Sequence, residues 1–240
     1  MRMSRVEEKA VEFIEKYVNV LFFIIVSISA IYVRYAGRDV LSGDTVGCLQ
    51  PWFDTIKQGG GVKALKYQVG DYNVLYQTCI AFMTYFKGNS MYIFKIFSVI
   101  FDFVMAFISA WMMSDMLSKK KFSTLFNMVY TVVLFLPTVV LNGAYWGQCD
   151  AIYTAFLLLT LYYLYKEKYV GAFVFLGIAF GFKFQAVLLL PFIICYYFYK
   201  KRFSIFMFVI TAVVFWATGI VAFINGRGIM EPFKIYMSQT

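Results

Sequence analysis

The sequence contains no histidine, and this absence narrows the chemistry that the chain can perform. A catalytic dyad built on histidine is impossible, so any general acid–base catalysis would fall to carboxylates. The four cysteines are scattered and form no Cys-x-x-Cys pair: Cys48, Cys79, Cys149 and Cys195. Because protein zinc sites rely mainly on cysteine and histidine, we expect no zinc site.

Charge is also scarce, and apolar residues take its place. Only 15% of the residues are charged, against about a quarter in ordinary soluble domains. Hydrophobic residues make up 62% of the chain, and the mean hydropathy is +0.72. Apolar runs recur along the chain and are apolar on all sides, as in 18–33, whereas barrel strands alternate in polarity. We therefore expect an all-α, polytopic transmembrane protein.

The net charge of +9 does not indicate nucleic acid binding. The basic residues form short clusters between apolar runs, at 119–121, 166–168 and 200–202, as loops on the cytoplasmic side of a membrane do. Placing all three clusters and the N-terminus in the cytoplasm requires that 72–86 lie along the outer surface. Residues 6–17 would form a surface helix. The predicted spans are then seven: about 18–35, 92–117, 123–142, 150–165, 169–183, 185–199 and 203–224.

The first extracytoplasmic loop, residues 36–91, is long and polar in its first half. Residues 36–71 hold four aspartates, Pro51 and a run of three glycines, which are turn-forming residues. We expect short juxtamembrane helices within this loop, for example at 50–57. The whole chain, 1–240, is read as a single module, and we expect it to be the N-terminal part of a longer enzyme.

One polar constellation, just outside the first predicted span, contains Arg34, Arg38, Asp39, Asp44 and Asp54. A solvated loop would explain such a cluster, since aspartate and glycine favour turns. The alternative is a general base at the membrane surface. Asp44 follows Ser42-Gly43, where the glycine lets the backbone turn and present the side chain.

A second constellation, residues 142–150, connects two predicted spans on the same outer face. Trp146 and its neighbouring tyrosine would suit an interfacial aromatic belt, and Asp150 could cap the next helix. Both explanations leave Trp146 and Gln148 free. Because an indole can stack on a sugar ring while amides and carboxylates bind hydroxyls, we expect Trp146, Gln148 and Asp150 to bind a sugar or an acceptor.

Three ionisable residues stand within apolar surroundings, where charge is costly. Lys183 could extend to the interface or bind a phosphate leaving group. Lys95 is a weaker candidate for the same task. Asp102 lies deep in the second predicted span and could pair with a lysine, line a cavity or bond a neighbouring helix.

From about Tyr35 onward, the sequence resembles the GPI-mannosyltransferase-II-like group of bacterial membrane proteins, in the GT-C superfamily of glycosyltransferases. The segments that carry the resemblance are Ser42-Gly43-Asp44, Pro51-Trp52-Phe53-Asp54, Gly70-Asp71-Tyr72-Asn73, Trp146-Gly147-Gln148-Cys149-Asp150 and Phe182-Lys183-Phe184-Gln185. The resemblance implies a seven-helix membrane module, a catalytic aspartate in the first extracytoplasmic loop, here Asp44, and inverting transfer from a polyprenyl-phosphate sugar. It favours a bacterial plasma membrane.

We accordingly expect an integral-membrane, mannosyltransferase-like enzyme that transfers sugar to a glycan or lipid-linked acceptor. Asp44 is the expected base, and Lys183, Arg34 and Arg38 are the expected phosphate ligands. Asp54, Asp71, Asp102 and Lys95 are candidate supporting residues. No cofactor is indicated, although Asp44 and Asp54 could share a divalent metal such as Mg or Mn. The alternatives are a transporter, or a flippase or polymerase of lipid-linked glycans.

Overall fold

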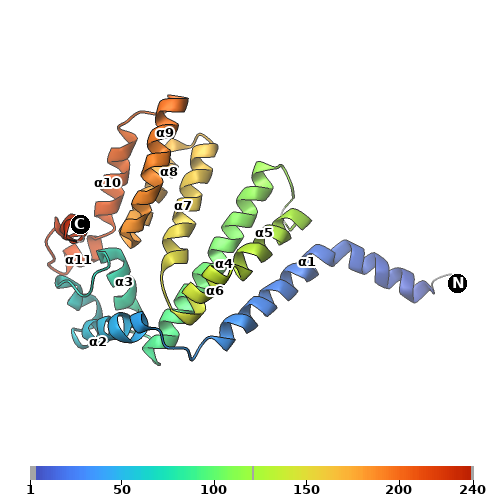
Figure 1. Cartoon of the computed structure of the whole chain (residues 1–240), viewed down its shortest axis with the longest axis horizontal. Coiled ribbons are helices and arrows are strands. Elements are labelled where there is room, and N and C mark those ends of the chain that lie inside the picture. Colours follow the sequence, from blue (N-terminus) through green and yellow to red (C-terminus); the bar gives the residue numbers. More distant parts are fainter. Residues whose placement is uncertain (1–3, 121, 239–240) are drawn as a thin grey trace.

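A computed structural model describes residues 4–120 and 122–238, and within them the chain is entirely helical (Figure 1). The α-helices are α1 (Arg5–Ala36), α2 (Gln50–Gln58), α3 (Val74–Met83), α4 (Ser90–Met116), α5 (Thr124–Phe135), α6 (Pro137–Val140), α7 (Asp150–Tyr165), α8 (Tyr169–Phe182), α9 (Leu190–Lys200), α10 (Met207–Ala217), α11 (Ile220–Ile224) and α12 (Glu231–Met237). Shorter turns of π or 3₁₀ geometry are η1 (Thr45–Leu49), η2 (Gly61–Lys66), η3 (Leu141–Tyr145) and η4 (Phe184–Leu189). The all-α prediction is confirmed.

The first helix is longer than the sequence pattern predicted. A separate surface helix over 6–17 was expected before the first span, but α1 runs unbroken from Arg5 to Ala36. It contains no glycine or proline that would end a helix between the two parts. Ser4 and Glu7 form a capping box at the N-terminus of α1. At its C-terminus, the Gly37 N–H donates to the carbonyls of Arg34 and Tyr35.

Within the described residues, two helices are long and apolar enough to cross a bilayer: Val11–Ala36 within α1, and α4. A third crossing could be made by α5 with α6 and η3, but this pair is bent by 55°. The segment predicted as one span over 123–142 thus consists of two helical segments joined at a bend. Pro137 lacks an N–H and pushes Leu136 to an extended ψ of 124°, which interrupts the helix.

The remaining apolar helices are shorter than the roughly 20 residues of a typical span. The bounds of α7 and α8 agree with the predicted segments 150–165 and 169–183. The segment 185–199 divides into η4 and α9, and 203–224 divides into α10 and α11. By length, the described residues thus contain two candidate spans, or three with the bent pair, and seven spans stay a prediction.

The helices form a row in which α4 packs against α5 and α7, α7 against α8, and α8 against α10. Figure 1 shows α2 and α3 below the row, at one set of helix ends, whereas the turns α4–α5, α7–α8 and α9–α10 lie at the opposite ends of the helices. These turns carry the basic clusters, apart from Lys121, which lies outside the described residues. Polar loop segments and basic turns therefore occupy opposite ends.

The segments at the α2–α3 end share one hydrophobic core with the helix row. Phe53 of α2 and Ile80 of α3 are buried together with Phe94 of α4, Ile152 of α7 and Tyr236 of α12. The first loop therefore does not extend freely into solvent but packs against one end of the helix bundle. This packing fixes the loop aspartates relative to the turn before α7.

Candidate functional site

The segment that carries Asp44 lies directly against the turn before α7. The Thr45 hydroxyl donates to the Trp146 carbonyl at 3.0 Å, and the Gln148 side-chain amide donates to Asp44 Oδ2 at 2.9 Å. Gln148 is buried, whereas Asp44 is exposed. Two predicted site segments that are about a hundred residues apart in sequence are therefore in contact. The bond from Gln148 orients Asp44, whose second carboxylate oxygen has no hydrogen-bond partner among the described residues.

Tyr72 extends this contact and was not predicted as a site residue. Its hydroxyl donates to Gln148 Oε1 at 2.8 Å, so Gln148 bonds Tyr72 and Asp44 at once. Gly70 permits this placement: its φ is +72°, and a Cβ would lie 2.1 Å from the Trp52 ring. Burial raises the pKa of Tyr72 far above its usual range, so the phenol stays protonated and donates. The Gly-Asp-Tyr-Asn motif was the available signal.

Lys183 and Asp150 form the adjacent part of this cluster. The Lys183 ammonium lies 2.5 Å from Asp150 Oδ1 and 5.3 Å from the centre of the Tyr72 ring. Asn142 donates to the other Asp150 oxygen at 2.6 Å. Lys183 is therefore a charged group that is already paired.

Asp150 is thus not a helix cap. Cys149 occupies the capping position of α7, and Asp150 is its first residue, with its carboxylate turned to Lys183 and Asn142. We name Asp44, Gln148, Tyr72, Lys183 and Asp150 the loop cluster. Trp146 belongs to it through its carbonyl, and the residue as a whole is 45% exposed.

Arg34 is not a loop residue. It is buried in the last turn of α1, where its guanidinium lies 2.9 Å from Asp102 Oδ2 and also donates to the Leu134 carbonyl at 3.0 Å. Gly143 packs against the Asp102 carboxylate, where a Cβ would lie 2.4 Å from Oδ2. Asp102 therefore pairs with an arginine, and the pair joins α1, α4 and the α5–α6 bend.

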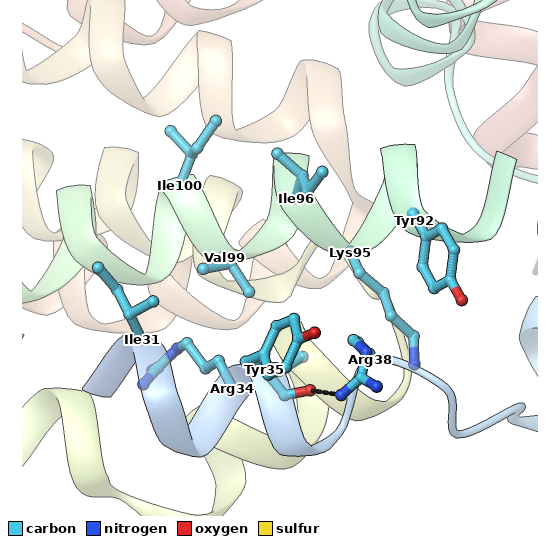
Figure 2. A pocket seen from close by; sticks show the side chains of 10 residues that line it. Ile31, Arg34, Tyr35, Arg38, Tyr92, Lys95, Ile96, Val99 and Ile100 are labelled. Atoms are coloured by element: carbon cyan, nitrogen blue, oxygen red, sulfur yellow. Dashed lines mark hydrogen bonds between the residues drawn. The ribbon is translucent and has the colours of Figure 1, made fainter. Parts of the chain in front are cut away.

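A groove of about 540 Å³ lies between α1 and α4 (Figure 2). Its lining combines three cations with mostly apolar residues: Ile31, Arg34, Tyr35, Arg38, Tyr92, Lys95, Ile96, Val99, Ile100 and Ala144. Figure 2 shows Arg38 and Lys95 near the end of α1 and the isoleucines further along the two helices. We name this the α1–α4 groove.

The cations of the α1–α4 groove are held by fixed partners. Lys95 donates to the carbonyls of Gly37 at 2.8 Å and Val40 at 2.6 Å. Arg38 lies 3.1 Å from Asp39 and 3.9 Å from the centre of the Tyr35 ring. Arg34, Arg38 and Lys95, predicted from separate parts of the sequence, are thus brought together. Lys183 instead lines a smaller cavity of about 190 Å³ that includes Asp71 and Tyr72.

The two remaining predicted supporting residues, Asp54 and Asp71, lie on the surface of the protein. Asp54 is exposed on α2 and makes no side-chain hydrogen bond or ion pair within residues 4–120 and 122–238, and Asp71 is also exposed. Among the described residues, no group of three or more histidine, cysteine, aspartate or glutamate side chains could hold a metal ion. A divalent metal shared by Asp44 and Asp54 stays a prediction.

No protein-family model, curated protein or solved structure matches this chain. The function must therefore be argued from the residues themselves.

Proposed function

We propose that this chain is the membrane-embedded module of an inverting glycosyltransferase, whose donor is a sugar on a polyprenyl phosphate. The observation that carries the proposal is the α1–α4 groove. One end of this groove is lined by cations, the rest is apolar, and the groove lies beside the segment that bears Asp44. A polyprenyl phosphate has the same two parts, an anionic head and a long apolar tail.

The charge of the groove favours an anion. Arg34 is balanced by Asp102 and Arg38 by Asp39, but Lys95 has no carboxylate within ion-pair distance in the described chain. An ammonium has three N–H donors, and Lys95 uses two of them on carbonyls. One donor and one unbalanced positive charge remain, and charge-assisted bonds to phosphate are among the strongest in proteins.

The apolar part of the groove is open to the surroundings of the protein. Ile31 is 57% exposed, Ile96 61% and Ile100 52%, and they lie on the two helices long enough to cross a bilayer. In a membrane this surface contacts lipid tails rather than water. A polyprenyl tail could therefore enter sideways without leaving the bilayer.

The loop cluster supplies the chemistry. Asp44 accepts the proton of an acceptor hydroxyl while that oxygen attacks the anomeric carbon, and the bond from this carbon to the phosphate oxygen breaks. The electron pair leaves with the phosphate, whose charge the cations of the α1–α4 groove stabilise. Attack from the face opposite the leaving group inverts the anomeric centre. Trp146, Gln148 and Asp150 are the proposed sugar or acceptor ligands.

The proposed orientation puts the loop cluster outside the cell. The basic turns lie opposite α2 and α3 in Figure 1, so the positive-inside rule assigns the basic end to the cytoplasm. The N-terminus of α1 would then be cytoplasmic, with seven spans in a bacterial plasma membrane. The short helices would cross where the bundle shields their ends from lipid.

Arg38→Gln provides a test of the donor. We expect polyprenyl phosphate to bind the chain in lipid nanodiscs about 10- to 100-fold more weakly after this change, because one charge-assisted bond of about 1.5–3 kcal/mol is lost. Radiolabelled polyprenyl phosphate in a filter assay, with polyprenol as competitor, measures this. Lys63→Gln, in the exposed η2 turn, is the matched control and should bind like the wild type. Equal binding of polyprenol, or no change in Arg38→Gln, would refute the donor assignment.

A transporter or lipid flippase is the second candidate, and one observation favours it. The 55° bend between α5 and α6 lies beside the Arg34–Asp102 pair, and transporters place broken helices next to buried charges. A flippase would move the labelled lipid across the bilayer without forming a new glycosidic bond. Product analysis therefore separates the two functions.

A further inference from the structure

A second cavity, of about 320 Å³, is lined by Asp102, the ion-pair partner of Arg34 in the α1–α4 groove. It lies between α4, the α6–η3 segment and the first turns of α7. Its lining residues are Asp102, Met105, Thr138, Val139, Asn142, Asp150, Ala151, Tyr153 and Thr154. We name it the Asp102 cavity. Its volume is at the lower end of the range of small-molecule sites, about 300–1,000 Å³.

Two hydrogen-bond acceptors at this cavity have no donor. Asp102 is fully buried, and its Oδ1 has no partner in the described chain, although Oδ2 is bound by Arg34. Asn142 Oδ1 is likewise buried without a partner. A buried acceptor without a donor costs about 1–3 kcal/mol. The cavity therefore favours a ligand that donates hydrogen bonds.

The charges around the cavity exclude a simple cation site. Asp102 is paired with Arg34 at 2.9 Å, and Asp150 is paired with Lys183 at 2.5 Å. Each carboxylate already has its own positive partner, so the formal charge at the cavity is zero. A metal ion or ammonium would add a charge with nothing to balance it. A neutral ligand with several donors fits this balance.

We propose that the Asp102 cavity binds a neutral, hydroxyl-rich ligand, and that this ligand is a saccharide. Asp102 Oδ1 and Asn142 Oδ1 accept its hydroxyls, the remaining lone pairs of Asp150 accept others, and the Tyr153 ring borders the cavity as an apolar surface. The choice of a saccharide among hydroxyl-rich ligands rests on the proposed sugar transfer. Asp150 also belongs to the loop cluster, so a sugar held here touches the same residue that pairs with Lys183.

Direct sugar binding tests this proposal. The full chain in nanodiscs is titrated with tritiated mannose, glucose, galactose and N-acetylglucosamine in equilibrium dialysis, with saturation-transfer NMR as a second readout. We expect at least one of the four to bind. Thr138→Trp fills the exposed mouth of the cavity without removing an ion pair, and it should weaken this binding at least about tenfold. Val132→Trp adds the same bulk at an exposed site on α5 outside the cavity and should bind normally.

Two further variants make the outcomes distinct. Asn142→Leu removes one orphan acceptor without changing charge and should also weaken binding about tenfold or more. Asp44→Asn should lower transfer by about 10²- to 10⁴-fold but leave sugar binding unchanged, because Asp44 does not line this cavity. Sugar binding without transfer in the wild type would sink the proposed function and keep the saccharide site. No binding of any of the four sugars, or binding that survives both Thr138→Trp and Asn142→Leu, would overturn the site.

Discussion

Replacing Asp44 by asparagine is expected to lower sugar transfer by about 10²- to 10⁴-fold, the usual contribution of a positioned general base. The amide oxygen of asparagine can still accept the hydrogen bond from Gln148, so the contact between the first loop and the turn before α7 should survive. Only the capacity to take a proton is lost. Donor binding and the free energy of unfolding should therefore stay near the wild-type values.

The measurement is the rate of transfer from radiolabelled polyprenyl-phosphate sugars by the full-length protein. Glu12→Gln makes the same carboxylate-to-amide change on the exposed start of α1 and is the matched control. Turnover of Asp44→Asn within a few-fold of the control would return Asp44 to an ordinary loop aspartate.

Replacing Arg34 by methionine is expected to destabilise the fold by about 3–5 kcal/mol, because it strands a buried carboxylate. Asp102 is fully buried, and within the described part of the chain Arg34 supplies its only side-chain hydrogen bond. The loss should be measured as the change in the free energy of unfolding in mixed detergent micelles. Because Arg34 also joins α1 to the Leu134 carbonyl, the α5–α6 bend should loosen at the same time.

Two further variants identify the cause of the loss. The double variant Arg34→Met with Asp102→Leu removes both charges and should recover most of the stability, since an apolar pair can replace a buried ion pair. Arg38→Met breaks an ion pair whose side chains are 42% and 59% exposed, and exposed pairs contribute about 0–1 kcal/mol. Equal losses in Arg34→Met and Arg38→Met would contradict the assigned role of the buried pair.

The helical class and several helix limits could be predicted because hydropathy and helix-ending residues act locally. The bounds of α4, α7 and α8 fall within two residues of the predicted segments. The α5–α6 bend was missed, although Pro137 was the local signal for it. The sequence interpretation also separated 6–17 from the first span. The charged residues of 6–17 suggested a surface helix, but no glycine or proline ends the helix between the two parts.

The residues of the candidate site could be predicted from the sequence, but the contacts between them could not. Asp44, Gln148, Asp150 and Lys183 were chosen from motifs, and the structure brings them together. Hydropathy cannot tell that Lys183 pairs with Asp150, because such contacts depend on how α7 and α8 pack.

The same limit applies to Arg34 and Lys95. Arg34 was assigned to a loop, yet it is buried against Asp102. Lys95 was a secondary candidate, but its contact with the end of α1 makes it the unbalanced charge of the α1–α4 groove. Pairings across helices follow from three-dimensional packing, which a single sequence does not display.

The central claim, transfer of sugar from a polyprenyl phosphate, is tested most directly by the product formed in sealed vesicles. Full-length protein in right-side-out and inside-out vesicles is supplied with a panel of radiolabelled polyprenyl-phosphate sugars, and the product and its anomeric configuration are identified. We expect one of these donors to give a product of inverted configuration, formed at the extracytoplasmic face. Lipid that crosses the bilayer unchanged, or transfer that requires a nucleotide sugar instead, would contradict the claim.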